Sequence, residues 1–174
     1  MLLNKIIPVL TFFKFKDENI IVIDCKNINL SLKVLKNHIG SQYALLTCIS
    51  GIDFLNTNYR FSVVYELLSL TYNSRLRLKI FLKETDFIAS SVNIFINANW
   101  WEREIWDLYG IYFNNHPDLR RILTDYGFEG YPLRKDFPLT GYVELEYNND
   151  KKRVLLKPVS LTQEYRSFSF ETSW

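Results

Sequence analysis

The stretch RLRLKIFLK, residues 75–83, decides the fold, because basic and apolar residues alternate along it almost without exception. Successive side chains of a β-strand point to opposite faces, so this pattern predicts a strand with one buried face and one wet face. Residues 59–72 are rich in aromatic and β-branched residues, which also favour a strand. Asn73 and Ser74 lie between the two segments and predict a hairpin turn. The sequence therefore predicts two adjacent antiparallel strands here.

Further helices and strands are expected on either side of this hairpin. Apolar periodicity indicates helices, short β-branched runs indicate strands, and glycine or asparagine marks their ends. In chain order the expected elements are a helix over residues 3–15, a strand over 20–24, a helix from Ser31 to His38 that Gly40 ends, a strand over 43–49 that Gly51-Ile52-Asp53 interrupts, and a helix from about 99 to 112.

The chain changes character beyond residue 112. Prolines and glycines recur there, and charged residues are interleaved with aromatic ones. Such a segment cannot bury itself against a core of its own, yet it is too aromatic for simple disorder. We therefore expect a core domain over residues 1–112 and an extended interaction segment over residues 113–174, which becomes ordered by lying on a partner.

The composition excludes several classes of protein. With 174 residues, 48% of them hydrophobic, and a net charge of +2, the chain does not have the composition of a disordered protein, and it lacks the basic excess that is typical of dedicated nucleic-acid binders. Cys25 and Cys48 are too few for a disulfide framework or a cysteine-only metal site, and His38 and His116 are too few for a histidine-rich one. The sequence contains no glycine-rich phosphate loop and no apolar run long enough to cross a membrane.

Residues 100–110, WWEREIWDLYG, form the densest group of charged and aromatic side chains. On a helix, Arg103 and Asp107 lie four residues apart and can form an ion pair. Glu102 and Glu104 diverge by about 200° around a helix, so they cannot act together as a general acid and base. We therefore interpret this helix as structural rather than catalytic.

Residues 116–138 carry features that are typical of an obligate protein interface. Planar guanidinium groups suit carboxylates of a partner, aromatic side chains anchor the centre of an interface, and charged residues form its rim. The residues that supply these features are Arg120 and Arg121; Tyr126, Phe128 and Tyr131; and Arg134, Lys135 and Asp136. His116 lies close to Asp118, but no serine or cysteine nucleophile accompanies this pair.

The same region carries motifs that one known family shares. They are Glu102-Arg103-Glu104, Asp107, Leu108-Tyr109, His116, Arg120, Ile122-Leu123, the runs 124–130 and 132–136, and the tail residues Pro158, Thr162-Gln163-Glu164-Tyr165-Arg166 and Phe168. On these motifs the chain resembles the 30-kDa core subunit family of respiratory NADH:ubiquinone oxidoreductase, complex I, and is most similar to the mitochondrially encoded form. It departs from the family pattern at Tyr131, where relatives often carry His, and at Thr172-Ser173-Trp174, where they often carry Ser-Pro-Trp.

The resemblance implies an α+β fold, in which helices pack on a mixed β-sheet and an extended C-terminal segment follows. It implies a core, cofactor-free subunit of the peripheral arm, on the matrix side of the mitochondrial inner membrane and associated with that membrane only through the complex. The partners would be the 49-kDa-type and quinone-proximal iron–sulfur subunits. FMN, iron–sulfur clusters, NADH and ubiquinone would bind to other subunits of this proton-translocating enzyme, so no catalytic, cofactor-binding or metal residue is expected in this chain.

Contacts with other subunits are expected from residues of the shared motifs and their neighbours. They are Glu102, Arg103, Glu104, Asp107, His116, Arg120, Arg121, Tyr126, Phe128, Tyr131, Arg134, Lys135, Asp136, Gln163, Glu164, Tyr165 and Arg166. The chain is enriched in Phe, Tyr, Ile, Asn, Lys and Leu, residues whose codons are rich in A and T. This bias and the lack of transit-peptide features favour an organelle-encoded chain. The alternatives are the same subunit in a bacterial or plastid complex, or a stand-alone RNA-binding β-sheet protein that uses the basic residues of the 75–83 strand.

Overall fold

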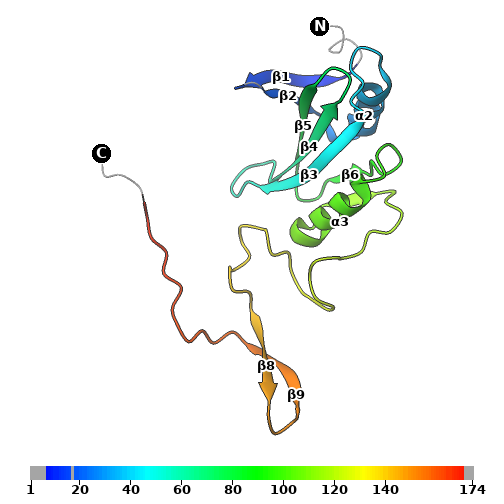
Figure 1. The fold of residues 1–174 in the computed structure, drawn as a ribbon. Coiled ribbons are helices and arrows are strands. Elements are labelled where there is room, and N and C mark those ends of the chain that lie inside the picture. The colour runs from blue at the N-terminus through cyan, green and yellow to red at the C-terminus, as the bar shows by residue number, and fades with distance from the viewer. Residues whose placement is uncertain (1–6, 17, 171–174) are drawn as a thin grey trace. The chain divides into compact units, whose positions relative to one another are not determined.

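The computed structural model describes residues 7–16 and 18–170, which form two units that meet between Phe137 and Pro138. The first unit holds a five-stranded sheet in the order β1-β2-β5-β4-β3 (Figure 1). The strands are β1 (Val9–Phe15), β2 (Glu18–Ile23), β3 (Leu45–Asp53), β4 (Phe61–Ser69) and β5 (Ser74–Leu82). Strands β2 and β5 run parallel and all other neighbours are antiparallel, so the sheet is mixed. The α+β fold is confirmed.

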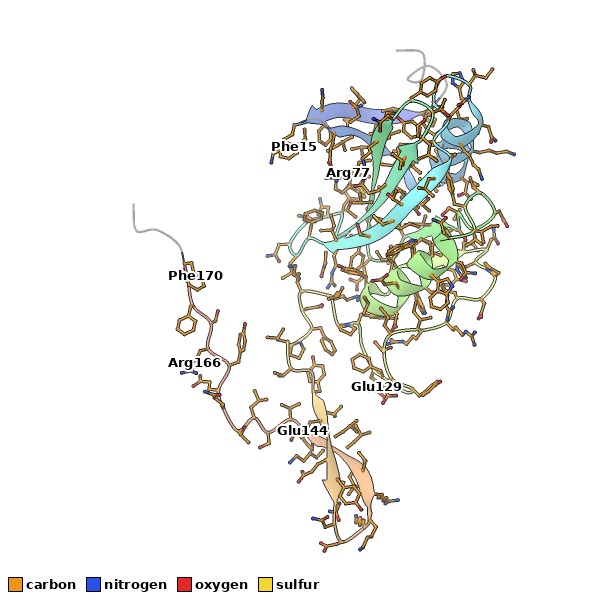
Figure 2. The ribbon with its side chains drawn as sticks, viewed as in Figure 1. Phe15, Arg77, Glu129, Glu144, Arg166 and Phe170 are labelled. Carbon is orange, nitrogen blue, oxygen red and sulfur yellow. The ribbon has the colours of Figure 1, made fainter. Side chains whose placement is uncertain are left out.

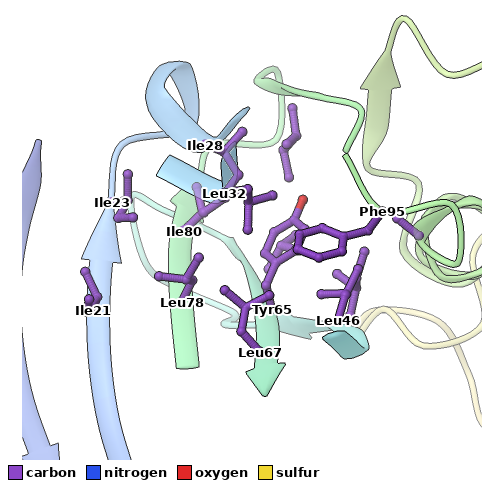
Figure 3. Packing of buried hydrophobic residues seen from close by; sticks show 14 of the residues in the cluster. Ile21, Ile23, Ile28, Leu32, Leu46, Tyr65, Leu67, Leu78, Ile80 and Phe95 are labelled. Carbon is purple, nitrogen blue, oxygen red and sulfur yellow. The ribbon is translucent and has the colours of Figure 1, made fainter. Parts of the chain in front are cut away.

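Two α-helices complete the first unit, α2 (Ile28–Asn37) and α3 (Ala98–Tyr109), and the short 3-10 helix η1 (Cys25–Asn27) leads into α2. A small parallel pair, β6 (Phe87–Ala89) and β7 (Tyr112–Asn114), lies before and after α3 in the chain. Ile28 and Leu32 of α2 pack over Leu78 and Ile80 of β5, as Figure 3 shows. Helix α2 therefore covers one face of the sheet.

The predicted hairpin at the centre of the fold is confirmed. Strands β4 and β5 pair in antiparallel register from Phe61 opposite Leu82 to Ser69 opposite Ser74. Leu76, Leu78, Ile80 and Leu82 of β5 are buried in the core, whereas the basic residues between them and Phe81 lie on the more exposed face. Alternation in the sequence was sufficient here because a half-buried strand must place its two sets of side chains on different faces.

The predicted N-terminal helix is wrong. Within the described residues of that segment, Val9–Phe15 is a strand that pairs with β2 in a hairpin, while residues 3–6 lie outside the described part of the chain. Its sequence VLTFFKF is rich in aromatic and β-branched residues, which fit a pleated surface better than a helix. Strand β2, with Ile20 to Ile23, is the pairing partner that the local sequence could not show.

The predicted interruption at Gly51 is also wrong, because β3 continues through Gly51 to Asp53. Tyr109 of α3 explains the glycine: a Cβ atom built at Gly51 would lie 2.7 Å from the Tyr109 ring. Gly51 therefore allows helix and strand to approach closely rather than ending the strand. Helix α3 itself ends at Tyr109, since Gly110 adopts a left-handed conformation with φ of 74° and donates its N–H to the Trp106 carbonyl.

The first unit extends to Phe137, beyond the boundary at residue 112 that the sequence suggested. Residues 113–137 have little regular structure, but backbone and side-chain hydrogen bonds attach them to α3 and β3. In the second unit β8 (Val143–Asn148) and β9 (Arg153–Pro158) form an antiparallel hairpin that the sequence analysis missed. The alternating sequence VELEYN of β8 was an available signal.

Candidate interaction site

Helix α3 is the platform on which most of the predicted contact residues meet. Its buried face carries three charged side chains, Glu102, Arg103 and Asp107, among the apolar residues Ala98 and Ile105. Charged groups are seldom buried unless other groups satisfy them. The partners of these three side chains therefore decide what the helix does.

Glu102 is fully buried and binds the segment that precedes the helix. Its carboxylate accepts hydrogen bonds from the Ser90 hydroxyl at 2.6 Å, and from the hydroxyl and backbone N–H of Ser91 at 2.6 and 2.7 Å. His116 lies on the other side, with Nε2 3.9 Å from Glu102 Oε2 and 3.2 Å from the Asn99 carbonyl oxygen. The Asp118 N–H donates to Nδ1 of His116, which places the ring proton on Nε2.

Asp107 is fully buried and holds the loop that follows β7. Three consecutive backbone N–H groups, those of Ile122, Leu123 and Thr124, donate to Oδ2 at 3.1, 2.7 and 3.0 Å. The Thr124 hydroxyl donates to Oδ1 at 2.6 Å, and the Arg121 guanidinium lies 3.6 Å from the same oxygen. Burial alone would raise the pKa of Asp107, but these hydrogen bonds outweigh it, so the pKa lies below its ordinary value.

The predicted ion pair between Arg103 and Asp107 is wrong. Arg103 donates through Nε to the Arg120 carbonyl at 3.2 Å, and its guanidinium lies 5.4 Å from the centre of the Trp100 ring. Asp107 instead accepts hydrogen bonds from the backbone N–H groups of residues 122–124. Helical spacing made the pair possible, but the folded loop offered both side chains backbone partners that no helical pattern can predict.

Residues 131–137 are attached to the end of the sheet by a second charged network. The Asp53 carboxylate is buried at the end of β3, where it accepts hydrogen bonds from Nε of Arg60 at 3.1 Å and the Lys135 N–H at 2.8 Å. Arg60 also pairs with Asp136 at 2.8 Å. Burial raises the pKa of Asp53, but the bonds from Arg60 and Lys135 outweigh burial and hold that pKa below its ordinary value.

Arg134 links this network to the C-terminal end of α3. Its Nε donates to the Tyr109 carbonyl at 2.7 Å, and its Nη1 lies 2.9 Å from a Glu84 carboxylate oxygen. The guanidinium lies 4.6 Å from the centre of the Tyr131 ring, and Arg121 lies 5.0 Å from the same ring. Tyr131 therefore contacts two cations, and an imidazole at this position is not required for packing.

The predicted contact residues thus divide into two groups. One group is bound within the first unit, and it contains Glu102, Arg103, Asp107, His116, Arg121, Tyr131 and Arg134. Phe128 is half-buried against Phe137. The other group is exposed, apart from the half-exposed Glu104, and contains Arg120, Tyr126, Lys135, Asp136, Gln163, Glu164, Tyr165 and Arg166. Asp53, Arg60, Glu84, Ser90, Ser91 and Thr124 complete the networks and were not predicted.

Two further features of the described residues bear on function. They include no group of three or more His, Cys, Asp or Glu side chains that could hold a metal ion, and no helix long and apolar enough to span a membrane. On the basic strand β5, Arg77 forms ion pairs with Glu66 and with Glu18, the latter at 2.9 Å. These pairs reduce the positive charge that an RNA-binding face would need.

Comparison with known proteins defines the class. The family described as "Respiratory-chain NADH dehydrogenase, 30 Kd subunit" matches residues 21–143. "NADH-ubiquinone oxidoreductase subunit 9" of Reclinomonas americana is 53% identical over 148 residues, which cover 85% of this chain and 72% of that protein. "NADH dehydrogenase [ubiquinone] iron-sulfur protein 3" of Beta vulgaris is 54% identical over 140 residues, or 80% and 73% of the two chains.

A solved structure has the same fold. A chain of the membrane-bound sulfane sulfur reductase, an archaeal respiratory membrane complex, matches with a TM-score of 0.68 at 20% identity, over 79% of this chain and 82% of that chain. The mixed sheet and the helices thus form an α+β fold that this solved chain shares. The chain belongs to the respiratory-chain NADH dehydrogenase 30 Kd subunit family. It is a core subunit of NADH:ubiquinone oxidoreductase, which excludes the stand-alone RNA-binding alternative.

The depressed pKa values of Asp53 and Asp107 predict acid lability. Both folded carboxyls titrate below the ordinary value of 3.8, so the unfolded chain takes up protons first as the pH falls. Each carboxylate therefore contributes its full stabilisation above about pH 5, and this contribution decreases as the pH falls through 3.8 towards the folded pKa. A difference of one between the folded and unfolded pKa values corresponds to about 1.4 kcal/mol. Urea unfolding of the full chain between about pH 6 and 3 measures this dependence. Asp107→Asn should flatten the slope below about pH 5, and an unchanged slope would contradict the assignment.

Proposed function

We propose that this chain is a non-catalytic scaffold in the peripheral arm of NADH:ubiquinone oxidoreductase. It holds the 49-kDa-type and quinone-proximal iron–sulfur subunits in fixed relative positions on the matrix side of the mitochondrial inner membrane. The chain is encoded in the organelle genome. FMN, the iron–sulfur clusters, NADH and ubiquinone bind to other subunits. Electron transfer between clusters needs fixed distances, and a rigid α+β domain with a docking segment supplies them. Family membership and the relatives from R. americana and B. vulgaris support this proposal.

The observation that carries the proposal is the apolar face of the β8–β9 hairpin. Cross-strand neighbours share a face, so the pairs Val143–Pro158, Leu145–Leu156 and Tyr147–Val154 lie on one side of the ribbon. Their large side chains are exposed, with Leu156 at 70% and Leu145 at 63%. A two-stranded ribbon is marginally stable alone in water, so this face requires an apolar surface to cover it.

The opposite face of the hairpin is charged and suits water. Lys157 pairs with Glu144 at 3.2 Å and also with Glu146, while Asn148 lies opposite Arg153. Figure 2 labels Glu144 on this hairpin. Only Leu155 among the residues of this face is apolar. The ribbon thus has one face for a partner and one for solvent. Exposed aromatic residues continue this pattern beyond the hairpin, at Tyr165, Phe168 and Phe170.

We assign the contacts to the exposed group of predicted residues and a different role to the buried group. Tyr126, Lys135, Asp136 and the run Gln163 to Arg166 are accessible to another subunit. Asp107 and Arg134 fix the loops on which Tyr126, Lys135 and Asp136 lie, and Glu102 holds residues 90–91 on the same helix. Buried motif residues then act by positioning rather than by touching a partner.

The proposal is tested by placing one carboxylate on either face of the hairpin. Leu156→Asp puts a charge in the apolar face, and we expect the assembled complex to decrease about tenfold or more, because burying a charge costs several kcal/mol. Leu155→Asp is the matched control, since it changes the neighbouring leucine on the charged face. Blue-native electrophoresis of native membranes measures the amount of complex.

If the chain is a scaffold, its variants should lower the amount of complex but not the activity of each assembled complex. In the complex that still assembles with Leu156→Asp or Arg134→Ala, cluster reduction and quinone turnover should be normal. Normal assembly with either variant, together with a collapse of cluster reduction or quinone chemistry, would show that the chain acts in catalysis instead.

A further inference from the structure

The loop of residues 123–130 in the first unit carries a tyrosine at its tip. Tyr126 is 102% exposed, so its side chain is as accessible as in an extended peptide. Leu123, on the same loop, is 61% exposed. Figure 2 shows Glu129 at the outer end of the loop, away from helix α3. One short loop therefore presents two large side chains to the surroundings of the domain.

The backbone of the loop holds Tyr126 in a tight turn. The Phe128 N–H donates to the Asp125 carbonyl at 3.1 Å, and the Tyr126 N–H donates to the Asp125 side chain at 2.8 Å. Gly127 adopts φ of 71°, as the third residue of a type II turn requires. A Cβ atom built at Gly127 would meet nothing within 4 Å, so glycine is needed here for its backbone conformation and not for space.

Both ends of the loop are fixed to the domain. On one side, the Asp107 carboxylate binds the N–H groups of residues 122–124. On the other side, Nη2 of Arg121 donates to the Gly130 carbonyl at 3.0 Å, and the Phe128 ring lies 6.0 Å from the Phe137 ring. The tip is thus presented on a fixed loop, and its burial in a partner costs little conformational entropy.

The charged side chains of the loop are all negative. Asp125 and Glu129 are exposed on either side of Tyr126 in the sequence. Residues 122–130 contain no lysine, arginine or histidine, although the whole chain has a net charge of +2. Like charges repel, which argues against an anionic membrane or a nucleic acid as the partner of this loop. Complementary potential instead requires basic side chains around the surface that receives Tyr126.

We propose that Tyr126 inserts into an apolar pocket of another subunit and that lysine or arginine side chains form the rim of this pocket. This inference rests on the proposed function, since the partner is a different polypeptide of the assembled complex. Tyrosine is enriched among the residues that dominate binding at interfaces, because it buries a large ring and keeps a hydroxyl for a hydrogen bond. The cations of the rim face Asp125 and Glu129.

The loop gives the first unit an attachment of its own. The β8–β9 hairpin belongs to the second unit and offers an apolar face. The loop offers one aromatic side chain between two carboxylates. The two contacts therefore need partner surfaces of different chemistry, and a variant in the loop leaves the hairpin unchanged.

Truncation of the tyrosine in the full chain tests the pocket. Tyr126→Ala removes a side chain that is fully exposed in the domain, so the urea midpoint of the isolated chain should not change. The amount of assembled complex on blue-native electrophoresis should fall about tenfold or more, because an interface anchor is lost. Tyr59→Ala, at another exposed tyrosine of the first unit, is the matched control and should assemble normally.

Two results of this experiment would overturn the inference and leave the scaffold proposal intact. One is normal assembly of Tyr126→Ala. The other is a lowered urea midpoint of that variant, which would show that Tyr126 supports the fold rather than a contact. If the native chain migrates outside any large complex, the proposed function itself fails, and that measurement comes first.

Substitution of Glu129 tests the basic rim. Glu129→Lys places a cation against the rim, and we expect about tenfold less assembled complex than with Glu129→Gln, which only removes the charge. Equal amounts of complex with the two variants would show that the rim is not basic.

A photo-crosslinking residue in place of Tyr126 identifies the neighbour in the same complex. A crosslink to a peptide of another subunit supports the inference, and the basic side chains should lie beside the crosslinked position. A crosslink to a second copy of this chain or to lipid overturns it.

Discussion

Replacing Asp107 by alanine should release residues 119–124 from helix α3 and lower the free energy of unfolding by about 3–4 kcal/mol. The carboxylate is the common acceptor for three backbone N–H groups and one hydroxyl, all from Ile122 to Thr124. Each donor that loses a charged acceptor costs about 1–3 kcal/mol when it stays buried, and less when the loop opens to water. The loss is a large fraction of the stability of an ordinary domain.

Urea unfolding of the full chain measures this change, and Asp118→Ala is the control. Asp118 lies in the same loop region, but it is exposed and pairs with exposed Arg120 at 3.0 Å, so its removal should change stability by less than about 0.5 kcal/mol. Limited proteolysis should cut the Asp107→Ala variant between 119 and 124 before any other part of the first unit. Equal stability of the two variants would show that Asp107 does not hold the loop.

Replacing Glu102 by leucine should cost about 3 kcal/mol, whereas Glu102→Gln should cost about 1 kcal/mol or less. Leucine leaves the buried Ser91 N–H and the Ser90 and Ser91 hydroxyls without their acceptor. The glutamine carbonyl can still accept from Ser91, and its amide can donate to the Ser90 oxygen, because a hydroxyl both donates and accepts.

The comparison of these two variants separates hydrogen bonding from charge. They are similar in volume and replace the same buried side chain, so the difference in denaturation midpoint reports the lost hydrogen bonds. If Glu102→Gln were as unstable as Glu102→Leu, the negative charge itself, facing His116 at 3.9 Å, would be the important property. If both variants were as stable as the parent, Glu102 would not hold residues 90–91.

The local pattern of apolar residues predicted secondary structure correctly where burial and backbone geometry favour the same element. The β4–β5 hairpin follows from alternation, and apolar spacing predicted α3, although the predicted end at residue 112 lies beyond the observed end at Tyr109. It failed at Val9–Phe15, because an apolar stretch of this length fits either a helix or a strand until its partner is known. It failed at Gly51 because the reason for that glycine is the Tyr109 ring, 58 positions further along the sequence.

The site was predicted as a set of residues but not as an arrangement. The motif residues from Glu102 to Asp136 were recognised, yet seven predicted contact residues are bound within the first unit. The same charged and aromatic residue types are used whether the side chains bind a neighbouring loop or a neighbouring subunit, so the sequence alone does not distinguish the two. Ser90, Ser91 and Asp53 were missed because short polar residues acquire their importance only from the buried charge or backbone that they satisfy.

The sequence by itself determined the family, the α+β class and the central hairpin, since these depend on residue identity and on spacing along the chain. Only the tertiary structure decided which charges are internal, that Val9–Phe15 is a strand of the sheet, and that the β8–β9 hairpin has one apolar face. The physical reason is the same in each case. A hydrogen bond, a buried charge or an exposed strand is defined by what lies next to it in space, and sequence spacing specifies that only within a few residues.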